Sequence, residues 1–153
     1  MKFNTLLIAA FLLLLWTDAT AQSAAQTSAS EITQITATLM DYIEGTANGE
    51  PDRLRKAFHP DFNLYTVTQE DSLRIRSGAK YIANVKEGKK SNRVGRILSI
   101  DFEKDAAIAK VEIVMPGWRI FTDYFLLLKY EDSWKIVHKS YTWRPFPAPP
   151  VKK

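Results

Sequence analysis

The stretch AAIAKVEIVMPGWRIFTDYFLLLKYEDSWKIVHKSYTW, residues 106–143, gives the strongest indication of the fold. It contains three runs rich in β-branched and aromatic residues, at 106–115, 119–130 and 134–143, and a similar run precedes it at 96–103. Only two or three residues separate each run from the next. Because loops this short join antiparallel neighbours, the C-terminal half of the chain predicts a meander of four antiparallel strands.

Upstream of these strands the hydrophobic spacing becomes that of a helix. Apolar side chains recur at steps of three and four from about residue 30 to residue 47, which predicts a long amphipathic helix. Ser28 and Glu31 fit a capping box at its start. Asn48-Gly49 is typical of a helix end.

Between the long helix and the meander the pattern predicts shorter elements. Pro51 favours a second, short helix, which His59-Pro60 ends. Residues 62–67 and 73–76 form a predicted hairpin, and Ser77-Gly78 is suited to begin a third helix. The predicted class is α+β, with a sheet that curls around the helices to cover its apolar face. The candidate bend points of the sheet are Gly95 and Gly117.

The first residues have the pattern of a secretory signal peptide over residues 1–21. Lys2 supplies a positive start, residues 6–16 (LLIAAFLLLLW) are an apolar run of 11 residues, and Ala19-Thr20-Ala21 has small residues at the two positions that signal peptidase reads. The run is shorter than the roughly 20 apolar residues of a spanning helix, so no stable membrane anchor is expected. We expect cleavage after Ala21 and export, to the periplasm or to the medium.

The remaining chain divides into three predicted parts. Residues 22–30 (QSAAQTSAS) are small and polar and predict a disordered lead-in. Residues 31–144 form the expected folded domain. Residues 145–153 (PFPAPPVKK) have four prolines in nine residues, which predicts an extended tail.

Composition excludes several kinds of protein and site. With 153 residues, of which 46% are hydrophobic, the chain fits one globular domain, and the absence of cysteine excludes disulfides and thiolate catalysis. The net charge is +4, but the densest basic cluster, residues 86–96, has no interleaved aromatic residues, so no nucleic-acid partner is expected. The only histidines are His59 and His138, and no nucleotide-binding or nucleophile motif occurs. We therefore expect no metal and no cofactor.

Four segments, in their order and spacing, resemble the nuclear transport factor 2-like superfamily. They are residues 41–50 (DYIEGTANGE), 57–62 (AFHPDF), 122–125 (TDYF) and 134–139 (WKIVHK). Within the superfamily the chain is similar to the putative lumazine-binding family of secreted bacterial proteins, over about residues 31–143. The resemblance implies a cone: a strongly curved antiparallel sheet wrapped around the N-terminal helix and two shorter helices, with a pocket between them. It also implies a homodimer that pairs through the outer face of the sheet.

A more distant member of the superfamily, ketosteroid isomerase, allows a comparison of residues. That enzyme uses an aspartate base and an oxyanion hole made of a tyrosine and a protonated aspartic acid. Tyr42 matches the place of the tyrosine, and Asp123 matches the place of the protonated aspartic acid. The base falls near Thr66, which cannot act as one. The resemblance thus implies that the polar pair persists as a ligand clamp without the isomerase base.

Strand alternation supports a pocket. The odd-numbered side chains of residues 106–115 are all apolar, which predicts an inner face. The resemblance places Asp123 inward on the next strand, where Arg119 is its expected partner. On the last strand His138 shares a face with small polar residues, which suit a pocket lined by hydrogen-bond donors. The predicted pocket residues are Tyr42, Phe62, Tyr65, Arg119, Phe121, Asp123, His138 and Ser140.

We expect an exported domain that binds a small molecule, planar or apolar, whose identity the sequence leaves open. The incomplete catalytic set favours binding over catalysis. One alternative is an isomerase or dehydratase in which Asp123 or His138 acts as acid or base and Tyr42 polarises the substrate. The other is a protein-interaction module that uses a covered face of the sheet.

Overall fold

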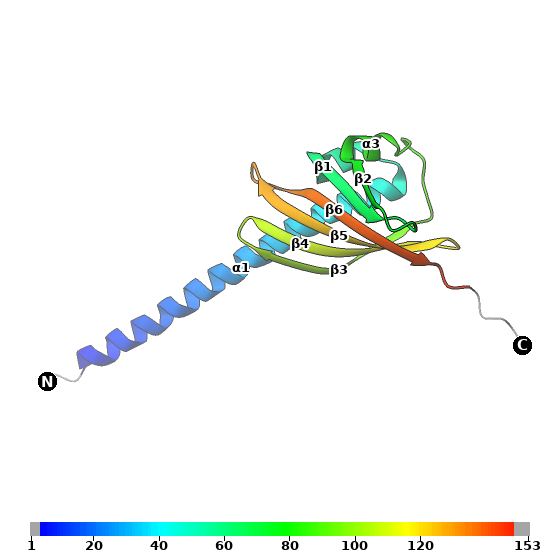
Figure 1. Cartoon of the computed structure of the whole chain (residues 1–153). Coiled ribbons are helices and arrows are strands. Elements are labelled where there is room, and N and C mark those ends of the chain that lie inside the picture. The colour runs from blue at the N-terminus through cyan, green and yellow to red at the C-terminus, as the bar shows by residue number, and fades with distance from the viewer. Residues whose placement is uncertain (1–3, 149–153) are drawn as a thin grey trace, which may run out of the picture. The chain divides into compact units, whose positions relative to one another are not determined.

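The computed structural model describes residues 4–148, and side chains are described for residues 26–148. The described chain has three helices and six strands (Figure 1). In chain order they are α1 (Asn4–Asn48), α2 (Pro51–Ala57), β1 (Phe58–Val67), β2 (Leu73–Ser77), α3 (Gly78–Ala83), β3 (Val94–Glu103), β4 (Ala106–Met115), β5 (Arg119–Tyr130) and β6 (Ser133–Pro145). The predicted α+β class is confirmed, and the limits of β4 and β5 agree with the prediction to the residue.

The six strands form one curved, unclosed sheet in the order β2-β1-β6-β5-β4-β3 (Figure 1). The pairs β1–β2, β3–β4, β4–β5 and β5–β6 are antiparallel, as expected from their short connections. β1 instead pairs with β6 in parallel. The sheet is therefore mixed rather than wholly antiparallel. Between β1 and β6 the chain passes through four strands, β2 to β5, and through α3.

The long helix differs from the prediction at its start. α1 continues through residues 22–30, where the sequence predicted a disordered lead-in, so Ser28 and Glu31 lie inside the helix. Five of the nine residues of this segment are alanine or glutamine, which are good helix formers and favour continuation of the helix. At its other end α1 stops at Asn48 as predicted, and Gly49 follows with a φ of 70°. None of the described helices has the length and apolar character that a membrane crossing requires.

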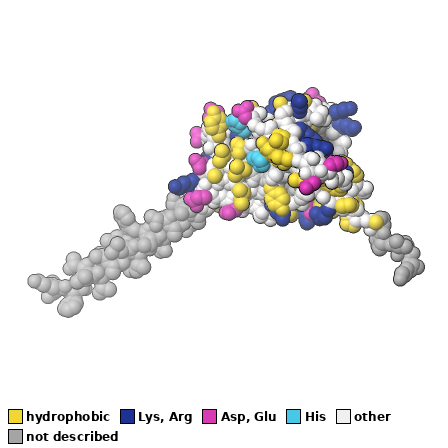
Figure 2. Space-filling model, in the orientation of Figure 1, with side chains coloured by type: hydrophobic (Ala, Val, Ile, Leu, Met, Phe, Trp, Pro, Cys, Tyr) yellow, Lys and Arg dark blue, Asp and Glu magenta, His cyan; other side chains and the backbone are white. Residues whose placement is uncertain are grey.

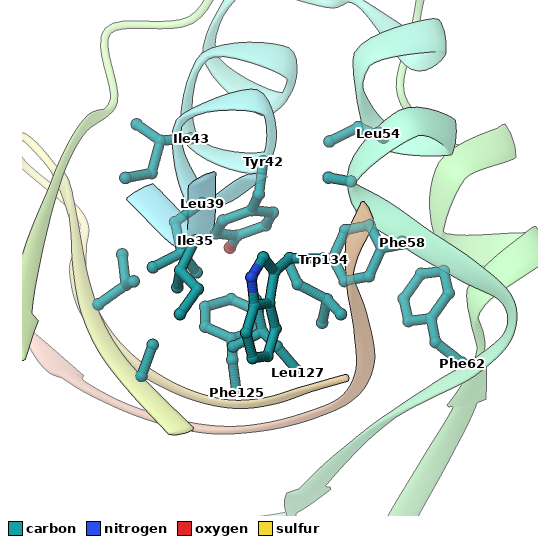
Figure 3. Close-up of a cluster of buried hydrophobic side chains, with 14 of the residues drawn as sticks. Ile35, Leu39, Tyr42, Ile43, Leu54, Phe58, Phe62, Phe125, Leu127 and Trp134 are labelled. Atoms are coloured by element: carbon teal, nitrogen blue, oxygen red, sulfur yellow. The ribbon is translucent and has the colours of Figure 1, made fainter. Parts of the chain in front are cut away.

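The chain divides into two compact units, residues 1–33 and residues 34–153, and the second contains the sheet and the core. There, one side of α1 packs on the concave face of the sheet, where Leu39 and Tyr42 meet Phe125 and Leu127 (Figure 3). The Thr38 hydroxyl also donates a hydrogen bond to the Trp134 carbonyl, at 3.1 Å. The odd-numbered face of β4 is buried as predicted, at Ala107, Ala109, Val111 and Ile113.

The two glycines expected at bends have different roles. Gly117 lies in the β4–β5 turn with a φ of 76°, a conformation that favours glycine. Gly95 lies on β3, where a Cβ atom would lie 2.5 Å from a methyl carbon of Ile43. Gly95 therefore allows β3 to approach α1 closely.

One extra residue in β6 decides which of its side chains face inward. Leu127 pairs with Ile136 and the adjacent Leu126 pairs with His138, so Val137 has no partner on β5 and forms a β-bulge. Before the bulge the even-numbered Ile136 is buried, whereas after it the odd-numbered Lys139 is buried. The bulge thus reverses the alternation that the sequence analysis extended along the whole strand.

Candidate functional site

A cavity of about 420 Å³ lies on the inner side of the sheet, bounded by the β1–β2 hairpin, α3 and strands β4 to β6. Aromatic side chains form much of its wall, from Tyr42, Tyr81, Trp118, Phe121, Tyr141 and Trp143. Five cationic side chains and two acidic ones also line it. The register of the hairpin explains part of this set, because Arg76 pairs with Leu64 and Arg74 pairs with Thr66, which puts both arginines on the inner face.

Three polar side chains form a closed network at the inner end of the cavity. The Tyr42 hydroxyl donates to Asp123 Oδ2 at 2.6 Å. The Lys139 ammonium donates to the same Asp123 oxygen at 2.8 Å and to the Tyr42 hydroxyl at 2.6 Å. Lys139 and Asp123 are both buried, with exposed side-chain fractions of 6% and 1%. This is a buried ion pair that a tyrosine bridges.

Lys139 was not among the predicted site residues, and it replaces the partner that the sequence suggested for Asp123. Arg119 makes no ion pair with Asp123. Its guanidinium instead stacks on Trp143, with its central carbon 3.6 Å from the ring centroid, and lies 4.6 Å from the Trp118 ring. Nothing in the sequence marks the bulge at Val137, and without the bulge Lys139 is assigned to the outer face.

Burial governs the ionisation of Tyr42. Desolvation, and then the negative charge of Asp123, hold the pKa of the Tyr42 hydroxyl well above its ordinary value. The hydroxyl therefore keeps its proton at neutral pH and remains a donor to Asp123. Tyr42 and Asp123 therefore lie side by side, as expected from their match to the tyrosine and aspartic acid of ketosteroid isomerase. Here, however, Lys139 neutralises the Asp123 carboxylate.

Two buried polar atoms of the described side chains have no hydrogen-bond partner, and both belong to residues that line this cavity. They are Asp123 Oδ1, an acceptor, and Arg93 Nε, a donor. Buried polar groups in proteins are nearly always satisfied, and an orphan atom at a cavity wall is the exception expected where a ligand or water supplies the partner. Two of the residues that line the cavity therefore each hold one unsatisfied polar atom, a donor in Arg93 and an acceptor in Asp123.

The structure brings four of the eight predicted pocket residues together at the cavity, namely Tyr42, Arg119, Phe121 and Asp123. Phe62 lies in the core instead, where its ring stacks on Phe58 at 3.8 Å between centroids. The other three, Tyr65, His138 and Ser140, lie on the outer face.

On that outer face, Tyr65 stacks on His138 at 4.6 Å between ring centroids. His138 and Ser140 line a second hollow of about 360 Å³, beside Tyr124 and Leu126. The bulge at Val137 is the physical reason for the error. Because the sheet lies between His138 and Asp123, the prediction that they act in one pocket is wrong.

No cluster of three or more histidine or acidic side chains with the geometry of a metal site occurs in the part of the chain that the structure describes. The two histidines are separate: His59 lies beside Tyr130, and His138 lies beside Tyr65. The ionisable groups that line the cavity belong to tyrosine, lysine, arginine, aspartate and glutamate residues.

Comparison with protein families identifies the chain. A family model described as "Putative lumazine-binding" matches residues 30–142. The chain belongs to this family. The match covers the helix and strands that enclose the cavity, and it agrees with the resemblance read from the sequence.

Solved structures place this chain in the nuclear transport factor 2-like superfamily. A nuclear transport factor 2-like protein of unknown function from Shewanella baltica OS155 is 27% identical, with a TM-score of 0.69 over 77% of this chain and 97% of that chain. Another from Methylobacillus flagellatus KT is 28% identical, with a TM-score of 0.66 over 75% of this chain and 93% of that chain. Both confirm the superfamily expected from the sequence.

A curated relative has a named activity. Aldolase FrzH from Cladobotryum sp is 27% identical over 115 residues, which are 73% of this chain and 90% of that protein. The alignment therefore covers most of both chains.

Proposed function

We propose that this protein is an exported domain that binds one small organic molecule in the cavity on the inner side of its sheet. The observation that carries the proposal is the pair of unsatisfied buried atoms, Asp123 Oδ1 and Arg93 Nε, on the wall of one cavity. A molecule with an acceptor and a donor group would satisfy both. The family description, lumazine binding, supports a small-molecule ligand.

The size and walls of the cavity suit a planar ligand. Its volume of about 420 Å³ lies in the usual range for small-molecule sites, roughly 300–1,000 Å³. Tyr81 and Tyr141 flank the polar network, and Trp118 and Trp143 lie with Arg119 at another part of the wall. Aromatic side chains bind flat rings well because they can stack on them.

The first test is native mass spectrometry of residues 22–153, produced through the protein's own export route. We expect a defined additional mass that denaturation releases. Thr66→Trp, which fills the cavity from β1, should abolish the additional mass, and Asn63→Trp, on the opposite face of the same strand, should retain it. A bare protein that also binds nothing in a metabolite screen contradicts the proposal.

Export is the second part of the proposal. The charged start, the apolar run of residues 6–16 and Ala19-Thr20-Ala21 support it. The mass of the protein recovered from its native host should correspond to a chain that begins at Gln22. A full-length chain that starts at Met1 in the cell would contradict export.

A second candidate function is acid/base catalysis on a carbonyl compound in the same cavity. The similarity to an aldolase favours it, and so does the geometry of Lys139. Two of the three ammonium hydrogens are directed to Tyr42 and Asp123, which leaves one for a ligand oxygen. A cation at that point stabilises the negative charge that develops on a carbonyl oxygen when an adjacent carbon is deprotonated or a carbon–carbon bond breaks.

The test uses a fluorogenic naphthyl β-hydroxyketone, which splits into a fluorescent aldehyde and a ketone. Turnover that Lys139→Arg and Tyr42→Phe both abolish, and that His138→Ala leaves unchanged, would support catalysis in the cavity. Turnover that is equal in all four proteins would arise elsewhere. Binding without turnover would leave the binding function alone.

We also propose that the outer face of the sheet pairs with a second copy of the chain. Hydrophobic side chains gather over this face beside a histidine (Figure 2). Ile108, Tyr124, Leu126 and Leu128 are each at least 40% exposed. Leu126→Glu should convert a dimer into a monomer in size-exclusion chromatography with light scattering, whereas Lys80→Glu, at an exposed position of α3, should not. A wild-type monomer at micromolar concentration would contradict the pairing.

A further inference from the structure

The arginines of residues 26–148 fall into two groups. Arg53, Arg55, Arg96 and Arg144 each form a salt bridge with a carboxylate. Arg74, Arg76, Arg93 and Arg119 form none within the described side chains, and all four line the cavity. The arginines without a salt bridge are therefore concentrated in the proposed ligand site.

Three of these cavity arginines, Arg76, Arg93 and Arg119, are half-buried. A guanidinium that loses water without gaining a carboxylate is destabilising, so such groups are normally paired. Arg93 shows the deficit most directly, because its Nε atom is buried and has no acceptor. The fourth, Arg74, is exposed. A hydrogen bond from Thr68 is the main cause that lowers the pKa of Glu70, and the charge of Arg74 adds to it.

The acidic groups of the cavity do not supply the missing charge. The Asp123 carboxylate is neutralised by Lys139 at 2.8 Å. The Glu70 carboxylate is exposed and lies in the β1–β2 turn. The cavity therefore has an excess of positive charge that no described side chain offsets.

Arg119 is also held in place. Its guanidinium stacks on Trp143 at 3.6 Å and lies 4.6 Å from the Trp118 ring centroid. Stacking fixes the plane of the group and leaves its N–H donors free, and a pre-oriented guanidinium loses less entropy when it binds an anion. Aromatic rings and a guanidinium thus lie together on one wall.

We propose, building on the binding function above, that the ligand is a planar organic anion whose negative charge is balanced by the guanidinium groups of Arg76, Arg93 and Arg119. The ring system packs on the aromatic wall, and the acidic group supplies the acceptor that Arg93 Nε lacks. Guanidinium groups recognise carboxylates, sulfonates and phosphates by the same paired N–H geometry. The charge of the ligand is therefore the property that the site selects.

Two fluorescent probes that differ by one charged group test this inference. Anilinonaphthalene sulfonate is an aromatic anion, and phenylnaphthylamine has the same rings without the sulfonate. We expect the anion to bind at least about tenfold more tightly. The free energy of a hydrogen bond to a charged group corresponds to about that ratio of dissociation constants. Arg93→Gln should weaken binding of the anion by about tenfold and leave binding of the amine unchanged.

Matched variants make the result specific. Arg93 lies in a segment without helix or strand, so its replacement leaves the sheet intact. Arg119→Gln, on β5, tests binding of the anion at a second arginine of the cavity. Arg55→Gln removes an exposed arginine outside the cavity and should change neither affinity. Near-ultraviolet circular dichroism verifies that each variant retains its packing.

The outcomes separate the two proposals. If both probes bind equally and the arginine variants change nothing, the inference of an anionic ligand is wrong, while the binding function stands. If neither probe binds, or if Thr66→Trp leaves the binding of both unchanged, the cavity is not a ligand site and both proposals fail. A tighter anion that responds to Arg93→Gln but not to Arg55→Gln supports the inference.

Discussion

The two faces of β6 are made from alternate residues of one strand, yet they have opposite properties. Lys139 and Tyr141 face the cavity, where the ammonium joins a buried network with Asp123 and Tyr42. His138 and Ser140 face outward, where the histidine stacks on Tyr65 beside exposed apolar residues. On the inner face the charge of Lys139 is buried and paired with Asp123, whereas the outer face holds apolar side chains in contact with solvent.

This difference shows that one backbone irregularity decides which side chains of β6 face the cavity. A regular strand would continue the alternation set by Trp134 and Ile136, which would direct His138 and Ser140 inward and Lys139 outward. The bulge at Val137 reverses that assignment. β1 is irregular at the same level, between Phe58 and Asn63, where it pairs with β6. The position of the ion pair therefore depends on the register of one residue.

Two single-residue deletions should give the largest effects and separate the faces. Deletion of Val137 removes the extra residue, so the pairings on both sides of it join in one register and Lys139 stays inward. Deletion of Ser140 instead reverses the strand beyond it, which directs Tyr141 and Trp143 outward. We expect the first variant to fold with its cavity intact and the second to be insoluble or unable to bind.

The measurement for both deletions is anion-probe fluorescence together with urea unfolding. The comparison fails if the two deletions are equally harmful, because the assignment of side chains to faces would then not depend on the bulge. Equal tolerance of both deletions would also count against it.

Removal of the buried cation should have the next largest effect. Lys139→Met leaves the Asp123 carboxylate buried without a counter-charge, which costs about 3–5 kcal/mol of unfolding free energy. Lys135→Met, on the same strand, removes a lysine whose ammonium donates to the Lys56 carbonyl oxygen at an exposed position, and it should cost less than about 1 kcal/mol. Urea unfolding followed by circular dichroism measures both.

A double variant identifies the cause of that loss. Adding Asp123→Asn to Lys139→Met removes the unpaired charge and should recover part of the stability. If the double variant is as unstable as the sum of the two single variants, the pair is not coupled and the network is merely a set of packed side chains.

Much of the fold could be predicted from the sequence, but only half of the predicted pocket residues line the cavity. Local sequence signals, which act within a few residues, predicted the limits of β4 and β5. They also predicted the end of α1 before Gly49 and the start of α2 at Pro51. The inward direction of Asp123 came from the family resemblance.

The missing half of the site depends on contacts between distant strands. The partner of Asp123 lies 16 residues away along the chain, on the far side of a bulge that no local residue preference marks. Arg76 and Arg93 become site residues only because the hairpin and the segment before β3 close over the sheet. Such proximity is a property of the tertiary fold, so spacing along the sequence could not predict it.

A tyrosine on each face gives a smaller contrast. Tyr42→Phe removes the hydroxyl that donates to Asp123 and accepts from Lys139, and the loss of hydrogen bonds to charged groups should cost about 1.5–3 kcal/mol. Tyr124→Phe, on the outer face, removes a hydroxyl from a side chain that is 46% exposed and should change stability by less than about 0.5 kcal/mol. Thermal unfolding at neutral pH distinguishes them, and equal losses would contradict the network.

The smallest expected effect comes from the ion pairs of Glu112, which lies on the outer side of β4 between Arg96 and Arg144. The hydrogen bond from Arg144 holds the pKa of the Glu112 carboxyl below its ordinary value of 4.5, against the opposing effect of burial, and the charge of Arg96 acts in the same direction as Arg144. A lowered pKa means that the unfolded chain binds the proton first, so this pairing stabilises the fold above about pH 4.5 and loses that contribution as the pH falls.

The stability difference between the wild type and Glu112→Gln should therefore be largest near neutral pH and shrink in acid. Because both arginines are more than half exposed, with side-chain fractions of 69% and 56%, solvent screens the pairs, and the difference should stay below about 1 kcal/mol and fall with added salt. The Lys139–Asp123 pair, buried on the inner face, should respond little to salt. Urea unfolding at high and low salt measures the contrast. If salt weakens both pairs equally, the inner network is open to solvent, and the distinction between the two faces does not hold.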